Sequence, residues 1–302
     1  MAFSSSSGEA TLFEQAGRAT ARAREKARAL AKPGVPLEEF AEKLEAYIAE
    51  LGCRPAFPIN ISINNVAAHY TPPRGDASVF GEKDVVKIDL GAQAGGCCGD
   101  TALTLDFSGE NGRLLEAAEA ALAAAISAIR AGARTSDVGA AVEREITSRG
   151  FRPVENLTGH QIKAGTLHAG KAIPNIGTRD HQVLEEGDII AVEPFASTGR
   201  GRVAEGTMVE IFSFVGRAGV RLPQSREVAA FVEKEYGSLP FAERWLHRKF
   251  PSRLFIQSAL RELAHAGALR PHPILSDAPG SLVSQAEHTV LVEKGGCSIL
   301  TR

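Results

Sequence analysis

Helical periodicity dominates the first half of the chain. Apolar residues, many of them alanine, recur there at the three- and four-residue spacing of one helix face, with charged residues between them. Pro33-Gly34 and Gly52 follow two of these stretches and are typical of helix ends. The pattern predicts four helices, over residues 9–31, 37–51, 112–131 and 136–149.

Shorter apolar runs predict strands. VVKIDLGA at 85–92 and TALTLDF at 101–107 flank the turn dipeptide Gly95-Gly96, so these two strands should pair as a hairpin. The alternation in FPINISINN predicts another strand before them. Further strands are predicted over 189–195, 208–215 and 281–294.

One segment repeats along the chain at a shift of 98 residues. Residues 32–55 and 130–153 align without a gap. A chance likeness between two amphipathic helices that end in glycine is the alternative explanation. We interpret the repeat as two similar halves packed about a pseudo-two-fold axis, with a cleft between them, because the shift is too long for a solenoid. The identical pairs are Gly34 and Gly132, Glu45 and Glu143, Ile48 and Ile146, Gly52 and Gly150, Arg54 and Arg152, and Pro55 and Pro153.

Residues 201–278 show a different pattern of predicted elements from the rest of the chain. Three helical stretches with short links, REVAAFVEKEYG, PFAERWLHRKF and SRLFIQSALRELAHAG, precede the strand-like LRPHPIL. Short helices followed by strands favour a small winged helix-turn-helix. A plain structural insertion is favoured over nucleic-acid binding, because nearby acids match the basic residues of the segment.

Composition narrows the class of protein. The 302 residues carry a net charge of −2, with 44% hydrophobic and 23% charged residues, which is typical of a soluble globular protein and gives no support to polyanion binding by bulk charge. No apolar run reaches the length of a membrane span, and the first residues lack the pattern of a secretory signal. The four cysteines form no CxxC pair, so we expect free thiols in a cytoplasmic chain.

Two acids mark the predicted hairpin. Asp89 lies inside an apolar strand, where a carboxylate is costly unless it is paired or binds a cation. Asp100 begins the next predicted strand, and a hairpin would bring the two side chains together. Converging carboxylates repel and shift each other's pKa, which a divalent metal ion relieves. Buried, hydrogen-bonded acids remain the alternative.

Three further residues extend this set. His160 lies in NLTGHQI, Glu193 in the apolar strand IIAVEPFAS, and Glu287 in the strand SQAEHTVLV. Oxygen-rich ligation with one imidazole suits Mn, Fe(II), Co or Zn better than a structural zinc site. Several carboxylates able to bridge suit two ions about 3.5–4 Å apart. Taken alone, His69 is a loop or core histidine, and His288 should face away from its neighbour Glu287.

A run of motifs then identifies a family. AFPINISINNVAAHYTPP, KIDLGA, GDTALTL, LTGHQI, HAGKAIPN, AVEPFAS and QAEHTVLV occur in order, and together they resemble the type II methionine aminopeptidases from about residue 10 to the end. The insertion between Glu193 and Glu287 distinguishes type II from type I, and the short N-terminus is similar to that of archaeal members. The resemblance implies the α+β pita-bread fold, with a catalytic domain of residues 1–200 and 279–302 and an inserted helical subdomain of 201–278.

The resemblance also implies roles for individual residues. Two metal ions per chain would activate a water that attacks the carbonyl after methionine. Asp89 would bind one ion, Asp100 and Glu287 both ions, and His160 and Glu193 the other. Glu193 would also shuttle the proton, His168 would bond the carbonyl and its oxyanion, and His69 would contact the scissile nitrogen. Phe57, Leu167 and Phe195 would line the methionine pocket.

One departure from the family pattern lies at the rim of that pocket. Many members have Tyr before Pro ahead of the last bridging Glu, whereas this chain has His272. Cys97 and Cys98 are expected in the hairpin turn near the metals, where we interpret them as incidental, with oxidative or metal sensitivity as the alternative.

The resemblance implies a cytoplasmic, monomeric enzyme that acts on peptide and nascent-protein N-termini beginning with Met, in proximity to the ribosome and without membrane or nucleic-acid binding. A proline-specific peptidase on the same fold is one alternative. A non-enzymatic binding protein is another, but such relatives lose metal ligands, and all five are present here.

Overall fold

The computed structural model describes residues 7–179 and 182–302. The four helices predicted before residue 150 are confirmed to within a few residues at each end. Three more helices lie in the second half of the chain. The helices are α1 (Ser7–Leu30), α2 (Leu37–Glu50), α3 (Gly112–Ala128), α4 (Thr135–Ser148), α5 (Pro223–Glu235), α6 (Glu243–Leu246) and α7 (Arg253–His265).

A nine-stranded sheet forms the centre of the molecule. Its strands follow the order β1-β4-β5-β15-β9-β7-β8, with β2 paired to β4 and β16 paired to β15. The strand bounds are β1 (Arg54–Pro55), β2 (Asn60–Ile63), β4 (Val85–Ala94), β5 (Cys97–Asp106), β7 (Thr158–Ile162), β8 (Ala172–Pro174), β9 (Ile189–Val192), β15 (Glu287–Glu293) and β16 (Gly296–Ile299).

Two smaller sheets flank the large one. The three-stranded sheet has the order β14-β10-β6, and the four-stranded sheet has the order β12-β11-β13-β3. Their strands are β3 (Val66–Ala68), β6 (Arg152–Pro153), β10 (Phe195–Ser197), β11 (Ala204–Phe214), β12 (Phe241–Ala242), β13 (Leu269–Ser276) and β14 (Val283–Gln285).

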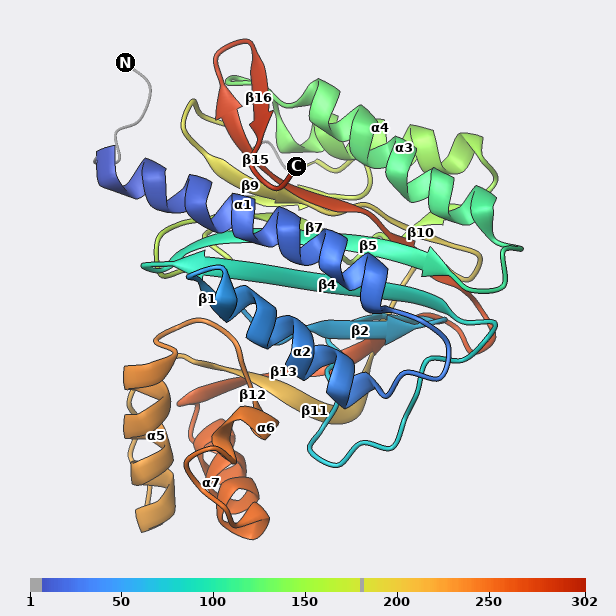
Figure 1. The fold of residues 1–302 in the computed structure, drawn as a ribbon. Coiled ribbons are helices and arrows are strands. Elements are labelled where there is room, and N and C mark those ends of the chain that lie inside the picture. Colours follow the sequence, from blue (N-terminus) through green and yellow to red (C-terminus); the bar gives the residue numbers. More distant parts are fainter. Residues whose placement is uncertain (1–6, 180–181) are drawn as a thin grey trace.

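The sequence repeat corresponds to a structural repeat. The bounds of α2 and α4, and those of β1 and β6, differ by the same 98 residues, so each half follows its helix with a two-residue strand. Helix α1 lies over β4 and β5, α2 packs beside α1 and β1, and α3 and α4 lie farther along the sheet (Figure 1). Ile88 and Leu90 of β4 pack into the core beneath α1 and α2, so the intervening Asp89 points to the opposite face.

The hairpin is tighter than the sequence pattern predicted. Strands β4 and β5 pair from Val85↔Asp106 to Ala94↔Cys97, and only Gly95-Gly96 lie between them. Both glycines have positive φ, 57° and 88°, as a two-residue turn that matches strand twist requires. Asp100 therefore lies inside β5 and does not begin it. Cys97 and Cys98 are buried in that strand, so their predicted place in the turn was wrong.

Two predicted long strands are each broken at a metal-ligand candidate. Strand β9 ends at Val192 and β10 begins at Phe195 in another sheet, because Pro194 has no N–H to donate to a ladder. The predicted strand over 281–294 is also divided between two sheets: β14 ends at Gln285 and β15 begins at Glu287, with Ala286 between them. Glu193 thus lies between strands and Glu287 is the first residue of β15, and neither has the predicted mid-strand position.

The segment predicted as an insertion has its own hydrophobic core. Trp245, Phe241 and Leu260 are among its buried residues, and β13 joins it to the rest through the pair Leu275↔Ala68. Within the described part of the chain, no helix has the length and apolarity to cross a membrane. The winged-helix arrangement and the limits 201–278 stay predictions.

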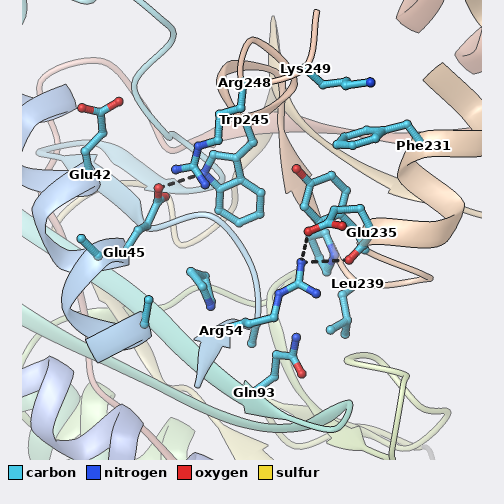
Figure 2. A pocket seen from close by; sticks show the side chains of 16 residues that line it. Glu42, Glu45, Arg54, Gln93, Phe231, Glu235, Leu239, Trp245, Arg248 and Lys249 are labelled. Carbon is cyan, nitrogen blue, oxygen red and sulfur yellow. Dashed lines mark hydrogen bonds and ion pairs between the residues drawn. The ribbon is translucent and has the colours of Figure 1, made fainter. Parts of the chain in front are cut away.

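A buried ion pair also ties the inserted segment to the first half. Arg244 donates to Glu45 of α2 and, at 2.7 Å, to the hydroxyl of Thr71. The indole Nε1 of Trp245 donates to the other carboxylate oxygen of Glu45 at 2.9 Å (Figure 2). Nearby, Arg54 donates to the carboxylate of Glu235 at 2.6 Å. Figure 2 shows the pocket whose lining includes Glu45, Trp245, Arg54 and Glu235.

Candidate metal centre

Five candidate ligands come from five neighbouring strands. Strands β4, β5, β15, β9 and β7 are consecutive in the large sheet, and each carries a candidate ligand or ends beside one. Asp89 lies opposite Ala102 in the hairpin, and Ala102 in turn lies opposite Glu287. The sheet order therefore gathers residues that are up to 198 positions apart in the chain. In strand order, the candidate ligands are Asp89, Asp100, Glu287, Glu193 and His160.

The side chains converge on one point. The Nε2 atom of His160 lies 3.5 Å from Asp100 Oδ2 and 3.7 Å from Glu193 Oε1. Asp100, His160 and Glu287 each offer one ligand atom within 4.8 Å of the others. These three residues are buried, whereas Asp89 and Glu193 are partly exposed to the cavity above them.

Without a metal ion, the surroundings of the cluster favour the neutral forms of its acids and of its histidine. Burial raises the pKa of Asp89, Glu193 and Glu287 well above the usual range, and repulsion from neighbouring carboxylates raises it further. Burial raises the pKa of Asp100 to about 7, against the opposing effect of a hydrogen bond with Glu287. Burial lowers the pKa of His160 to about 4, so its imidazole is neutral at pH 7 and able to bind a metal.

The unpartnered atoms of the cluster fit a cation. Asp89 Oδ1 and Asp100 Oδ1 are buried without a hydrogen-bond partner in the described residues. The amide of Gln285 donates to Asp89 at 3.3 Å and to Glu287 at 3.2 Å, but it is neutral. Buried carboxylates need compensating positive charge, and oxygen donors with one imidazole are a ligand set for divalent metals. The donor set is therefore chemically suited to metal binding.

Lys87 does not supply that positive charge. Lys87 is fully buried on β4, but its Nζ donates to the backbone oxygens of Asn64 at 3.0 Å and Val283 at 2.8 Å and not to the carboxylates of the cluster. Burial lowers its pKa to about 7.

The other predicted site residues line the cavity that opens above the ligands. The apolar part of the cavity wall includes Phe57, Leu167 and Phe195, and the same cavity is lined by His69 and His168. The His168 ring lies 4.2 Å from that of His160, centroid to centroid. His69 has a positive φ of 67°, and its Nδ1 lies 3.1 Å from the backbone oxygen of Pro273. The structure thus brings all ten predicted site residues to one cavity.

Several residues were missed from the sequence: Gln285, which donates to two candidate ligand carboxylates, and the wall residues Ile211 and Pro240. Gln285 could have been found, because it lies two residues before Glu287 and so shares its face of an extended chain. Ile211 and Pro240 could not, because they belong to the inserted segment, and nothing in their local pattern points to the cavity. His272, noted only as a rim residue, also lines the cavity. For His181 the sequence favours a surface position, but this residue lies outside the described residues.

The expectation that His288 faces away from Glu287 agrees with its contacts. Its Nδ1 lies 2.9 Å from the Thr301 hydroxyl, and it lines a different cavity, beside Arg24 of α1.

Comparisons with known proteins identify the family. Residues 11–234 match the model of metallopeptidase family M24. Among curated proteins, a methionine aminopeptidase of Pyrococcus horikoshii is 48% identical over 288 residues, which cover 95% of this chain and 97% of the relative. The chain therefore belongs to metallopeptidase family M24 and, within it, to the methionine aminopeptidases.

Solved structures agree with this fold. A methionine aminopeptidase from Thermotoga maritima superposes with a TM-score of 0.72 at 24% identity and covers 100% of both chains. A thermophilic Arx1 superposes with a TM-score of 0.86 at 18% identity, over 98% of this chain and 91% of its own. At these identities the likeness concerns the fold alone. The predicted pita-bread fold and the predicted class, a metal-dependent aminopeptidase, are confirmed.

Proposed function

We propose that this protein removes the N-terminal methionine from peptides and nascent proteins whose second residue is small. The observation that carries the proposal is the placement of the five-ligand cluster at one cavity whose wall includes Phe57, Leu167 and Phe195. Aliphatic and aromatic walls suit the flexible, unbranched thioether of methionine.

The cluster would hold two divalent ions. Asp89 would bind one ion, Asp100 and Glu287 would contribute to both, and His160 and Glu193 would bind the other. The unpartnered oxygens of Asp89 and Asp100 support this, because each carboxylate has an atom left for a metal. The donor set suits Mn, Fe(II), Co or Zn. When bound, such a pair of ions polarises the substrate carbonyl and makes a water acidic enough to react near neutral pH.

Three side chains would then act on the substrate. Glu193 would accept and return a proton. In the metal-free protein, burial and the neighbouring acids raise the pKa of its carboxyl well above the usual range. His168 is held neutral, because desolvation among the cavity side chains, together with the nearby His160, lowers its pKa. Its N–H would bond the carbonyl oxygen as negative charge develops there. His69 would contact the nitrogen of the scissile bond.

The same geometry would restrict the second residue of the substrate. That residue must fit beside the ligand cluster and the two imidazoles of His69 and His168. A bulky side chain would displace the carbonyl, and a misplacement of about 1 Å can lower the rate about 100-fold. Glycine, alanine and serine are therefore favoured at the second position.

A panel of peptides tests this function. Met-Ala-Ser and an Xaa-Pro tripeptide are incubated with the protein and added Mn or Co, and free amino acids are measured. Release of methionine from Met-Ala-Ser alone supports the proposal. Cleavage only of Xaa-Pro would favour a proline-specific peptidase. Cleavage of neither peptide, by folded and metal-loaded protein, would favour a binding role for this scaffold.

The setting of the reaction is part of the same proposal. An enzyme that trims initiator methionine acts in the cytoplasm, close to the ribosome, on chains as they emerge. We expect a monomer in which residues 1–200 and 279–302 form the catalytic domain and residues 201–278 the inserted subdomain. Gel filtration with light scattering tests the expected monomer.

A further inference from the structure

The backbone of His69 is held in an unusual conformation. Its φ of 67° is left-handed, a region that disfavours residues with a side chain. Such residues persist only where their surroundings hold them, and they cluster at functional sites. His69 directly follows β3, whose neighbour in the sheet is β13, the last strand of the inserted segment. The groups that hold His69 should therefore be sought on β13.

Two adjacent residues of β13 contact the His69 ring. The backbone oxygen of Pro273 lies 3.1 Å from His69 Nδ1. Because a carbonyl oxygen can only accept, this contact places the proton of the neutral ring on Nδ1. Nε2 is then left with its lone pair, as an acceptor. The ring of His272 packs edge-to-face on His69, with centroids 5.6 Å apart and planes at 81°.

His272 is itself anchored. Its Nε2 lies 2.8 Å from the hydroxyl of Ser213, which belongs to β11. Strand β11 pairs with β13 on the side away from β3, and Ile211 lies opposite His272 in that register. Contacts therefore run without a gap from β11, through the imidazole of His272, to the imidazole of His69.

We propose that His272, anchored by Ser213, is a positioning residue that keeps the His69 ring oriented with Nδ1 on the backbone oxygen of Pro273. That contact holds the proton on Nδ1, so that Nε2 accepts a hydrogen bond at the scissile nitrogen. The inference rests on the role of His69 in the proposed function. It makes the inserted segment part of the catalytic apparatus, because both groups that hold His69 lie on β13. A tyrosine or another side chain at position 272 would have to replace both the ring contact and the anchor.

Four variants test the proposal. His272→Ala removes the ring and the anchor. His272→Phe keeps an aromatic ring but leaves the Ser213 hydroxyl without its hydrogen-bond partner. Combining Ser213→Ala with His272→Phe removes that unpaired hydroxyl. His265→Ala, at an exposed position on α7, is the matched control. For each, kcat and KM on Met-Ala-Ser, metal content per chain, and the ¹⁵N shifts of the His69 ring are measured.

His272→Ala should lower kcat about 10–100-fold with little change in KM, because the ring of His69 loses its alignment. Metal content should stay at the wild-type value, because His272 is not among the ligands. The wild-type His69 signals should be those of a ring protonated on Nδ1 alone, and in His272→Ala they should move toward the average of the two tautomers. The double variant should recover more kcat than His272→Phe, and His265→Ala should match the wild type.

Wild-type kcat in His272→Ala would overturn the proposal, and so would unchanged His69 shifts in that variant. A loss of kcat that follows a loss of metal would also overturn it, because that result means general distortion of the site. The ¹⁵N spectrum needs no turnover. If the wild-type protein released no methionine, the proposed function would fail while the hold of His272 on the His69 tautomer could still be measured.

Discussion

Replacing Asp100 by asparagine should stabilise the metal-free protein as pH rises. Asp100 lies at the centre of the ligand cluster, with one oxygen unpartnered and the other 3.5 Å from the neutral His160. Its carboxylate is therefore poorly compensated when no metal is bound. Asparagine has nearly the same shape and carries no charge, so the variant removes the repulsion and leaves the packing in place.

The sign and size of the effect follow from the raised pKa. In the folded protein the pKa of Asp100 is about 7, against 3.8 for an ordinary aspartate. Between these values the folded state binds more protons than the unfolded state, so the free energy of unfolding falls with rising pH. One group contributes about 1.4 kcal/mol per pH unit, or on the order of 4 kcal/mol over this window. Because Glu287 shares the proton, we expect the two proteins to differ by about 2–4 kcal/mol above pH 7.

Urea unfolding in the presence of a chelator measures this difference. Wild type, Asp100→Asn and the exposed control Asp137→Asn are compared at intervals from pH 5 to pH 8. The advantage of Asp100→Asn over the wild type should grow with pH and level off above pH 7, and the control should track the wild type within about 0.5 kcal/mol. Parallel curves for wild type and Asp100→Asn would refute the claim that this carboxylate is buried without compensation.

Three other changes have separate outcomes. Gln285→Leu removes the amide that donates to two ligand carboxylates, and calorimetry should show metal affinity about 10–100-fold weaker, whereas unchanged affinity would mean that the amide does not orient them. Glu45→Ala leaves Arg244 buried without its partner and should lower the free energy of unfolding by about 3–5 kcal/mol, and a loss below 1 kcal/mol would mean that water reaches the guanidinium. His168→Ala should lower kcat about 100–1000-fold with full metal content, and loss of metal instead would make His168 a ligand.

Local patterns predicted the four helices before residue 150 well, because each is decided by its own residues. The predicted helical stretch PFAERWLHRKF contains only the four residues of α6. The bounds of α2 and α4 repeat at the 98-residue shift seen in the sequence, and buried alanines line the core-facing sides of α1 and α3. Strand limits were harder to predict. Glu193 was placed inside a strand because its neighbours are apolar, whereas Pro194 ends the ladder and sends the chain into another sheet.

The candidate site was predicted in part by chemistry and in part by resemblance. Asp89 and Asp100 could be paired from the hairpin alone, because the turn between their strands is local. Their meeting with Glu287 depends on β15 pairing with β5 across more than 180 residues, which no local pattern reveals. The contact of Gln285 with Asp89 and the contact of Ser213 with His272 also join residues that are far apart in the sequence, so local patterns do not reveal them.

The most direct test of the account is the dependence of methionine release on the second residue of the substrate. Metal-loaded protein is incubated with Met-Ala-Ser, Met-Leu-Ser and Met-Phe-Ser, with Asp100→Asn as the inactive control, and kcat/KM is measured for each peptide. Release from Met-Ala-Ser should be efficient, kcat/KM for the two bulky peptides should be lower by a factor of about 100 or more, and chelation should abolish release. Equal rates for the three peptides, or release that survives removal of the metal, would contradict it.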